Sequence, residues 1–232
     1  NMDILNSDLI YRIRSMINPK LKHKDFSFYL NRLKKIAPLS TEVLGDQFFL
    51  EKFPAYFQEL QINEEDLTEN LFYLPIFLKK YQERFKVEGF AIELVDYEFA
   101  CYQILQDPTP ERSSKYNDLT TELYLNPMAQ ALRLDYEIHE YAQALLTKKI
   151  TIDARPAKNK NLLFVSKNPE TNTLCFLKGN VHHAAIADEL HDGRLIKKGL
   201  IQNLQARFPD IAQREWIIAL KDLKSNFVII EN

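Results

Sequence analysis

Glycine is scarce in this chain, and its scarcity limits the kinds of site that the chain can build. Only 5 of the 232 residues are glycine, whereas loops that cradle phosphate groups need glycine where the backbone approaches the ligand closely. The glycine-rich motifs of P-loop and dinucleotide-binding proteins are absent, as are H-E-x-x-H and G-x-S-x-G. No matching set of catalytic groups replaces them. The sequence therefore favours a binding protein over an enzyme, and it predicts no cofactor.

Cysteines and long apolar runs are also few. The two cysteines, Cys101 and Cys175, lie among apolar residues, which is typical of reduced thiols in a core rather than of a disulfide or a redox pair. No apolar run reaches the roughly 18 residues that suggest a membrane span, and no secretory signal precedes the expected fold. We therefore expect a cytoplasmic protein without a membrane partner.

Neither sign of charge dominates, although the two parts of the chain differ. Residues 1–150 carry 18 Lys and Arg against 23 Asp and Glu, a net charge of −5, and residues 151–232 carry 12 against 9, a net charge of +3. A nucleic-acid-binding module is expected to have a clustered basic face. An excess of three positive charges does not indicate such a face, but it is compatible with one.

Hydrophobic periodicity predicts helices in the first half of the chain. Apolar residues recur at helical spacing over Leu5–Ile17 and again over Tyr29–Ile36, before Pro38. Further helices are expected from a cap at Asn63 to about Arg84, with a break at Pro75, and over Phe90–Leu105. Residues 1–110 are thus predicted to form a helical domain, and residues 111–118 are polar enough to be a linker.

The periodicity changes in the second half, residues 119–232. Leu132–Tyr136 alternates between apolar and polar residues, as a half-buried strand does. A helix over Ile138–Lys149 and a loop over Thr151–Lys160 are expected to follow. Two apolar strands then flank the polar turn Asn168–Asn172, and three helical segments and a last strand, Phe227–Ile230, complete the pattern. The prediction is an α+β fold, with an all-helical N-terminal domain before a winged-helix-like domain that has a small antiparallel sheet.

The hairpin is the main candidate for a binding site. Its apolar residues are consecutive rather than alternating, so both faces of the hairpin need cover. An exposed strand edge also presents backbone N–H and C=O groups to which another chain can add as a further strand. We expect either Leu162–Lys167 or Thr173–Lys178 to be the receiving edge. The candidate binding residues of the hairpin are Leu162, Phe164, Ser166, Lys167, Thr173, Cys175 and Leu177.

Two other groups of residues resemble chemical sites but have simpler interpretations. Glu98 lies in an apolar helical stripe, where it is either an acid–base group or, more in keeping with its surroundings, a polar anchor for a neighbouring helix or backbone. His182, His183 and His191 lie near Asp188, but a structural zinc site has four ligands and usually includes cysteine. The sequence therefore predicts no metal site.

Basic residues in the C-terminal region leave DNA binding open as an alternative. Arg194, Lys197, Lys198 and Arg207 follow one helical segment, where they can contact phosphates or a protein partner. They can equally form the solvated face of an amphipathic helix.

A series of short motifs resembles a known bacterial family. The N-terminal half of that family has motifs similar to Ile36-Ala37-Pro38, Val43–Asp46 and Leu74–Leu78 of this chain. The central helix of the family has a motif similar to Leu94–Ala100. The second half of the chain continues the likeness with Leu125–Pro127, Leu132–Tyr136, Leu162–Lys167, Ala187–Gly193 and Leu195–Leu204. Members of the family are named as DNA-binding-domain proteins and are partner subunits of multinuclear non-haem iron oxidases. Methanobactin biosynthesis protein C belongs to the family.

The resemblance implies a function that composition alone does not. It implies a helical domain followed by a winged-helix-like domain similar to peptide-recognition elements. It also implies a TIM-barrel iron oxidase as partner, which modifies cysteines of a ribosomally made precursor peptide. The chain would hold the leader of that peptide and dock it to the oxidase, and the iron would belong to the partner. A winged-helix DNA-binding transcriptional regulator remains the alternative.

Overall fold

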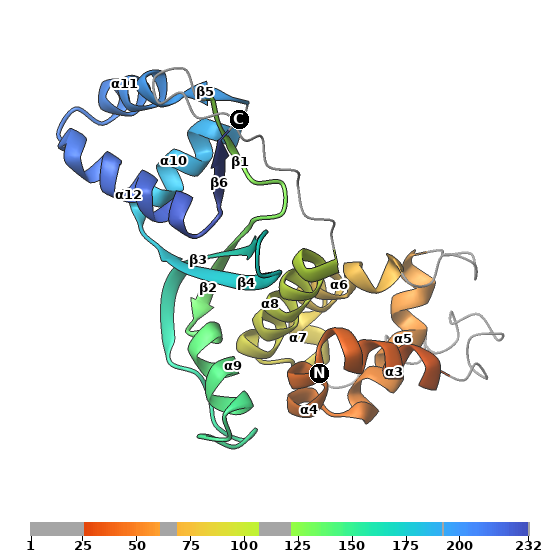
Figure 1. The fold of residues 1–232 in the computed structure, drawn as a ribbon. Coiled ribbons are helices and arrows are strands. Elements are labelled where there is room, and N and C mark those ends of the chain that lie inside the picture. Colours follow the sequence, from red (N-terminus) through yellow and green to blue (C-terminus); the bar gives the residue numbers. More distant parts are fainter. Residues whose placement is uncertain (1–25, 61–68, 107–121, 192, 232) are drawn as a thin grey trace, which may run out of the picture. The chain divides into compact units, whose positions relative to one another are not determined.

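The chain adopts a mixed α+β fold with a helical N-terminal region and small antiparallel sheets, as the sequence predicts (Figure 1). The structure, a computed structural model, describes residues 26–60, 69–106, 122–191 and 193–231. The expected helix over Leu5–Ile17, the cap at Asn63 and the linker at residues 111–118 lie outside these ranges.

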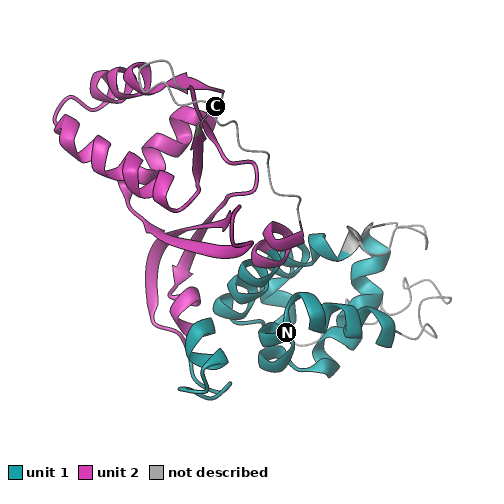
Figure 2. Ribbon diagram, viewed as in Figure 1, with its two compact units in different colours: residues 1–99, 142–155 teal, residues 100–141, 156–232 magenta. Residues whose placement is uncertain are grey.

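Contacts divide the chain into two compact units, drawn in different colours in Figure 2. The first comprises residues 1–99 and 142–155, and the second comprises residues 100–141 and 156–232. The predicted domain boundary falls in residues that the structure does not describe, so it stays a prediction.

The first unit is helical and has an aromatic core. Phe26 stacks on Phe57 with ring centroids 5.7 Å apart, and Tyr29 lies 4.6 Å from the same ring. Phe53 also belongs to this group and is fully buried. Such tilted and stacked pairs add to the stabilisation that burial provides. The helices are α3 (Ser27–Ile36), α4 (Pro38–Leu44), α5 (Asp46–Leu60), η2 (Glu69–Tyr73), α6 (Leu74–Lys80), α7 (Gln82–Phe85) and α8 (Gly89–Gln106), the last of which continues into the second unit.

Prolines lie in the first turns of two helices in this unit. α3 ends at Ile36, and Pro38 is the first residue of α4, where its missing N–H leaves no hydrogen bond unmade. The helix predicted to run to about Arg84, with a break at Pro75, is divided in its described part into η2, α6 and α7. Pro75 lies in the first turn of α6, and α6 ends before Tyr81.

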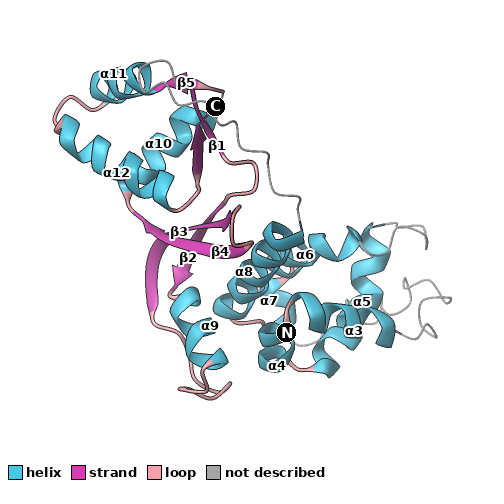
Figure 3. Ribbon diagram, in the orientation of Figure 1, coloured by secondary structure: helices cyan, strands magenta, loops and turns pink. Residues whose placement is uncertain are grey.

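In its described residues, the second unit contains two three-stranded antiparallel sheets (Figure 3). One has the order β2-β3-β4 and the other the order β5-β1-β6. The strands are β1 (Glu122–Leu125), β2 (Gln130–Tyr136), β3 (Lys158–Asn168), β4 (Thr173–Gly179), β5 (Leu195–Ile196) and β6 (Ile229–Glu231). The loop expected over Thr151–Lys160 is therefore wrong at its end, because β3 begins at Lys158.

The helices of this part are α9 (Ile138–Leu146), α10 (Val181–His191), α11 (Lys197–Arg207) and α12 (Gln213–Ser225). α10, α11 and α12 pack with β1 and β6 around a core that includes Trp216, Leu220 and Leu223, all essentially inaccessible to solvent. Three helices against a small antiparallel sheet are the elements that we expected in the winged-helix-like domain. Its sheet, however, is β5-β1-β6 rather than the hairpin β3–β4.

Within the described residues, no helix is both long enough and apolar enough to span a bilayer.

Candidate functional site

The order of strands decides which edge of the hairpin can accept a peptide. Residues 162–165 of β3 pair with β2 on one side and with β4 on the other. Ser166 and Lys167 extend beyond β2, but they are only 0% and 4% exposed. The expectation that Leu162–Lys167 is a receiving edge is therefore wrong. The alternative, Thr173–Lys178, lies on β4, which pairs only with β3 among the strands that the structure describes.

The predicted binding side chains are consequently divided between the interior and the edge. Phe164 is 2% exposed and belongs to the core around α10–α12, with Leu162 and Leu177 packed against it. The Ser166 hydroxyl donates a hydrogen bond to the carbonyl of Asn226. Phe164 and Ser166 are therefore interior residues, whereas Leu162 and Leu177 are half-buried.

Thr173 and Cys175 remain on the edge strand. Thr173 is exposed, and Cys175 is half-buried, which raises the pKa of its thiol. Both residues belong to β4, so the predicted binding residues that solvent can reach are concentrated on this strand.

The outer edge of β4 lacks the features that protect other edges. β2, the opposite edge strand, has a register irregularity between Leu134 and Tyr136 and carries the exposed charged residues Arg133 and Asp135. Bulges and charges of this kind hinder pairing with a further strand. β4 keeps an unbroken register with β3 and has one charged residue, Lys178. Of the two described edge strands of this sheet, β4 is therefore the better suited to receive another chain.

The two faces of β4 have different surroundings. Cys175 and Leu177 share the face that packs towards the core of α10–α12, because they lie opposite Ser166 and Phe164 of β3. Leu174 and Phe176 lie on the other face. There the His139 ring of α9 lies 4.3 Å from the Phe176 ring, and burial lowers the pKa of His139.

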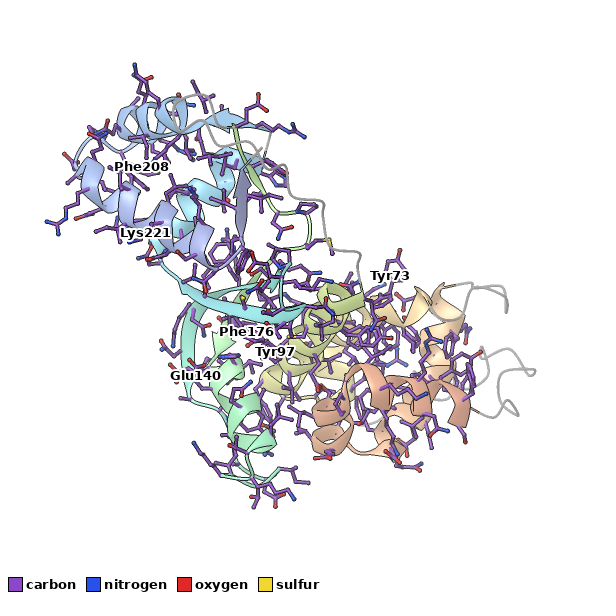
Figure 4. The ribbon with its side chains drawn as sticks, viewed as in Figure 1. Tyr73, Tyr97, Glu140, Phe176, Phe208 and Lys221 are labelled. Atoms are coloured by element: carbon purple, nitrogen blue, oxygen red, sulfur yellow. The ribbon has the colours of Figure 1, made fainter. Side chains whose placement is uncertain are left out.

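Charged residues stabilise the end of the strand. Lys178 Nζ lies 3.2 Å from Glu137 Oε1 and 3.3 Å from Glu140 Oε1. These interactions raise the pKa of Lys178, and hydrogen bonds from Asn159 and Lys178 lower the pKa of Glu137. Figure 4 labels Phe176 and Glu140 on the two elements concerned. The one charge of β4 is thus already engaged within the chain.

Sequence reasoning missed His139, Glu137 and Glu140 because nothing in their local pattern links α9 to a strand some 40 residues later. It also missed Gly179, which lies opposite Leu162. A glycine that ends an apolar strand is a signal of close approach, and a Cβ at Gly179 would lie 2.7 Å from Phe164 Cε2.

Glu98 is a structural anchor, which was the simpler of its two interpretations. It accepts hydrogen bonds from the backbone N–H of Leu39 (2.9 Å), from that of Ser40 (2.7 Å) and from the Ser40 hydroxyl (2.6 Å). Leu39 and Ser40 form the first turn of α4, whose N–H groups have no partner within the helix. Burial raises the pKa of Glu98, and these hydrogen bonds oppose the rise.

His183 also has a structural role. The Asn180 side chain accepts hydrogen bonds from the N–H groups of His182 and His183, while His183 Nδ1 accepts one from the Asn180 N–H at 3.0 Å. This reciprocal arrangement is a capping box with histidine in the position usually taken by Glu or Gln. Burial lowers the pKa of His183, whose Nε2 lies 3.6 Å from Asp222 Oδ2, beyond hydrogen-bond distance.

The other histidines do not form a metal site with His183. His182 packs edge-on against Trp216, with ring centroids 5.1 Å apart, and His191 is exposed at the end of α10. In the ranges that the structure describes, no three His, Cys, Asp or Glu side chains are grouped so that they could hold a metal ion.

The basic residues of the C-terminal region do not all lie on one helix. Arg194 precedes β5, with its guanidinium 3.5 Å from Glu122 and 4.9 Å from the Tyr124 ring centroid. Arg207 ends α11, 3.8 Å from Glu189. Lys197 and Lys198 are exposed in the first turn of α11. Two of the four cations are thus partly compensated by acidic neighbours.

No protein-family model matches this chain, and no curated protein sequence shows a significant similarity to it.

Proposed function

We propose that this chain is a non-catalytic partner protein that binds a ribosomal precursor peptide and docks it to a multinuclear iron oxidase. The observation that carries the peptide-binding part is the outer edge of β4, which has a regular register and pairs with no other described strand. An extended peptide can add to such an edge through main-chain hydrogen bonds and gain selectivity from alternate side chains.

The assignment of a non-catalytic role has separate support. The two groups that most resembled catalytic residues, Glu98 and His183, are engaged in capping the N-terminal turns of α4 and α10. A carboxylate that satisfies backbone donors in the interior is a poor acid–base catalyst, because substrate would have to displace those donors.

The identity of the partners rests on the ordered motifs between Ile36 and Leu204. These motifs resemble the oxidase-partner family, so the oxidase is expected to be a TIM barrel and to supply the iron and its ligands. The peptide would be the precursor that the oxidase modifies.

The test is co-expression with the iron oxidase that the resemblance leads us to expect beside this chain, followed by size-exclusion chromatography with and without the precursor peptide. We expect co-elution, strengthened by the peptide. Two separate peaks at micromolar concentrations under both conditions would contradict the proposal.

A DNA-binding regulator is the second candidate, favoured by the winged-helix-like arrangement of α10–α12 and by the exposed Lys197 and Lys198. In a DNA-binding winged helix, the wing is the loop of a hairpin that follows the third helix. Here β6 follows the third helix and pairs with β1, which precedes all three helices in the chain. This topology lacks that hairpin in the described residues, so it supports the peptide-binding candidate more than the regulator.

A further inference from the structure

The side chains along β4 indicate which class of peptide its edge would take, if the proposed peptide-binding function holds. Four consecutive residues of β4, Leu174–Leu177, are half-buried and apolar, and they point alternately to the two faces of the sheet. An edge strand with one solvated face would instead alternate between apolar and polar residues.

Side chains on both faces of β4 contact other parts of the chain. On one face, Leu177 contacts the core of α10–α12, which also contains Phe164. On the other face, Phe176 lies against His139 of α9. A strand added beside β4 would therefore have an apolar neighbour next to each of its central side chains, whichever face the side chain takes.

Polar residues at both ends of β4 limit the length of its apolar stretch. The exposed Thr173 and the turn Asn168–Asn172 precede the apolar residues, while Lys178, held by Glu137 and Glu140, and Asn180, the cap of α10, follow them. The apolar stretch spans four residues, so charged or strongly polar residues of a ligand are accommodated only beyond it.

We propose that the segment bound by β4 is a run of about four consecutive uncharged, β-prone apolar residues, rather than a strand that alternates between apolar and polar residues. Strands that are buried on both faces have such continuous apolar runs. Each residue of the run would pack against one of the side chains of Leu174–Leu177, and the peptide backbone would pair with that of β4.

The probes are synthetic, fluorescein-labelled peptides of equal length with the same polar flanks. One contains four consecutive Val and Ile residues, a second alternates Val with Thr, and a third repeats the first with all four backbone nitrogens of the run methylated. Fluorescence anisotropy with the full chain measures their affinities, and the natural precursor peptide serves as reference. We expect the alternating peptide to bind about tenfold more weakly than the continuous one, and the methylated peptide not to bind.

Protein variants form the matched arm of the experiment. Leu174→Lys places a charge within the apolar stretch and should weaken binding of the continuous peptide at least about tenfold. Thr173→Lys, one residue earlier and already exposed, should leave it within about twofold. Thermal unfolding followed by circular dichroism shows that both variants are folded before they are compared.

The failure of this inference is distinguishable from failure of the proposed function. If the precursor peptide binds but the alternating peptide matches the continuous one, the inference is overturned and peptide docking stands. If the precursor peptide does not bind, or if the methylated peptide binds as well as its parent, strand addition at β4 is overturned. A concentration-dependent dimer that no peptide dissociates would assign the edge to a second copy of the chain and would also overturn the inference.

Discussion

At the scale of single residues, the close contact at Gly179 shows how one missing side chain fixes the packing of the hairpin. Gly179 lies opposite Leu162, and the space where its Cβ would be is taken by the Phe164 ring and by Leu162. Because Phe164 is 2% exposed and part of the C-terminal core, its ring cannot move aside without disturbing that core.

Gly179→Ala is therefore expected to lower the free energy of unfolding by about 1–3 kcal/mol, as overpacked substitutions do. Chemical denaturation with urea measures the change. Gly199→Ala is the matched control, because a Cβ there would lie at an ordinary 3.5 Å from Ile196. Since Gly199 is in α11, the control should raise stability by roughly 0.5–1 kcal/mol. An unchanged midpoint for Gly179→Ala would show that the contact at Phe164 is not tight.

At the scale of elements, capping determines where α10 begins and makes its stability sensitive to pH. His183 Nδ1 can accept the hydrogen bond from the Asn180 N–H only when that nitrogen carries no proton. The lowered pKa of His183 has burial as its largest cause, and Asp222 partly opposes the effect. Folding thus favours the neutral form of His183.

This preference determines the direction in which stability changes with pH. A histidine with a lowered pKa in the folded state contributes stability that is present above its unfolded pKa of about 6.5 and is lost as pH falls through the folded pKa. His183→Gln keeps an acceptor at this position but does not titrate. We expect the stability of the native chain to fall more steeply below pH 6.5 than that of His183→Gln, as measured by urea unfolding from pH 7.5 to 5. His139, whose pKa is also lowered, is present in both proteins, so parallel curves would contradict the assignment to His183.

The elements also show how far the sequence could be interpreted. Local patterns predicted α3, the alternation in β2 and the hairpin, because each depends on neighbouring residues. The strand Leu195–Ile196 was missed, since two residues with helix-compatible neighbours carry no periodic signal and gain their partner from β1, some 70 residues earlier.

Strand order was the larger omission at the candidate site. β3 is the central strand, and β4 an edge strand, because β3 also pairs with β2. In the chain, the helix α9 separates β2 from β3. The local sequence of an apolar hairpin is the same whichever of its two strands pairs with a third strand. The sequence could therefore narrow the receiving edge to two strands, but it could not decide between them. Asp210 and Gln213 have the spacing of a capping box, but the N-cap of α12 is Ala212, without a side-chain hydrogen bond.

At the scale of the whole molecule, charge separates the two candidate functions. The chain has a net charge of −2, and two of the four basic residues considered for DNA contact lie near acidic partners. DNA binding releases counterions and so weakens steeply with salt, whereas main-chain pairing and apolar contacts do not.

Between 50 and 300 mM NaCl, we expect the affinity for the precursor peptide to change by less than about threefold. Anisotropy titrations at four salt concentrations measure it, with a labelled 30-base-pair duplex of mixed sequence as the comparison. The duplex is expected not to bind even at 50 mM. A salt-sensitive shift of the duplex together with no binding of the peptide would favour the regulator.

The position of β1 has a consequence for how this protein is made. β1 leaves the ribosome about a hundred residues before β6, yet it is the middle strand of their sheet, and the Asn126 side chain donates a hydrogen bond to the carbonyl of Phe227. During synthesis, β1 has neither neighbour until α10 and β5 have emerged, and it lacks β6 until α11 and α12 have emerged as well. Closing so long a loop is unfavourable before its partner strands are available. A fragment that starts after β1 would likewise leave β5 and β6 with no strand between them, so the three C-terminal helices cannot be treated as an independently expressible module.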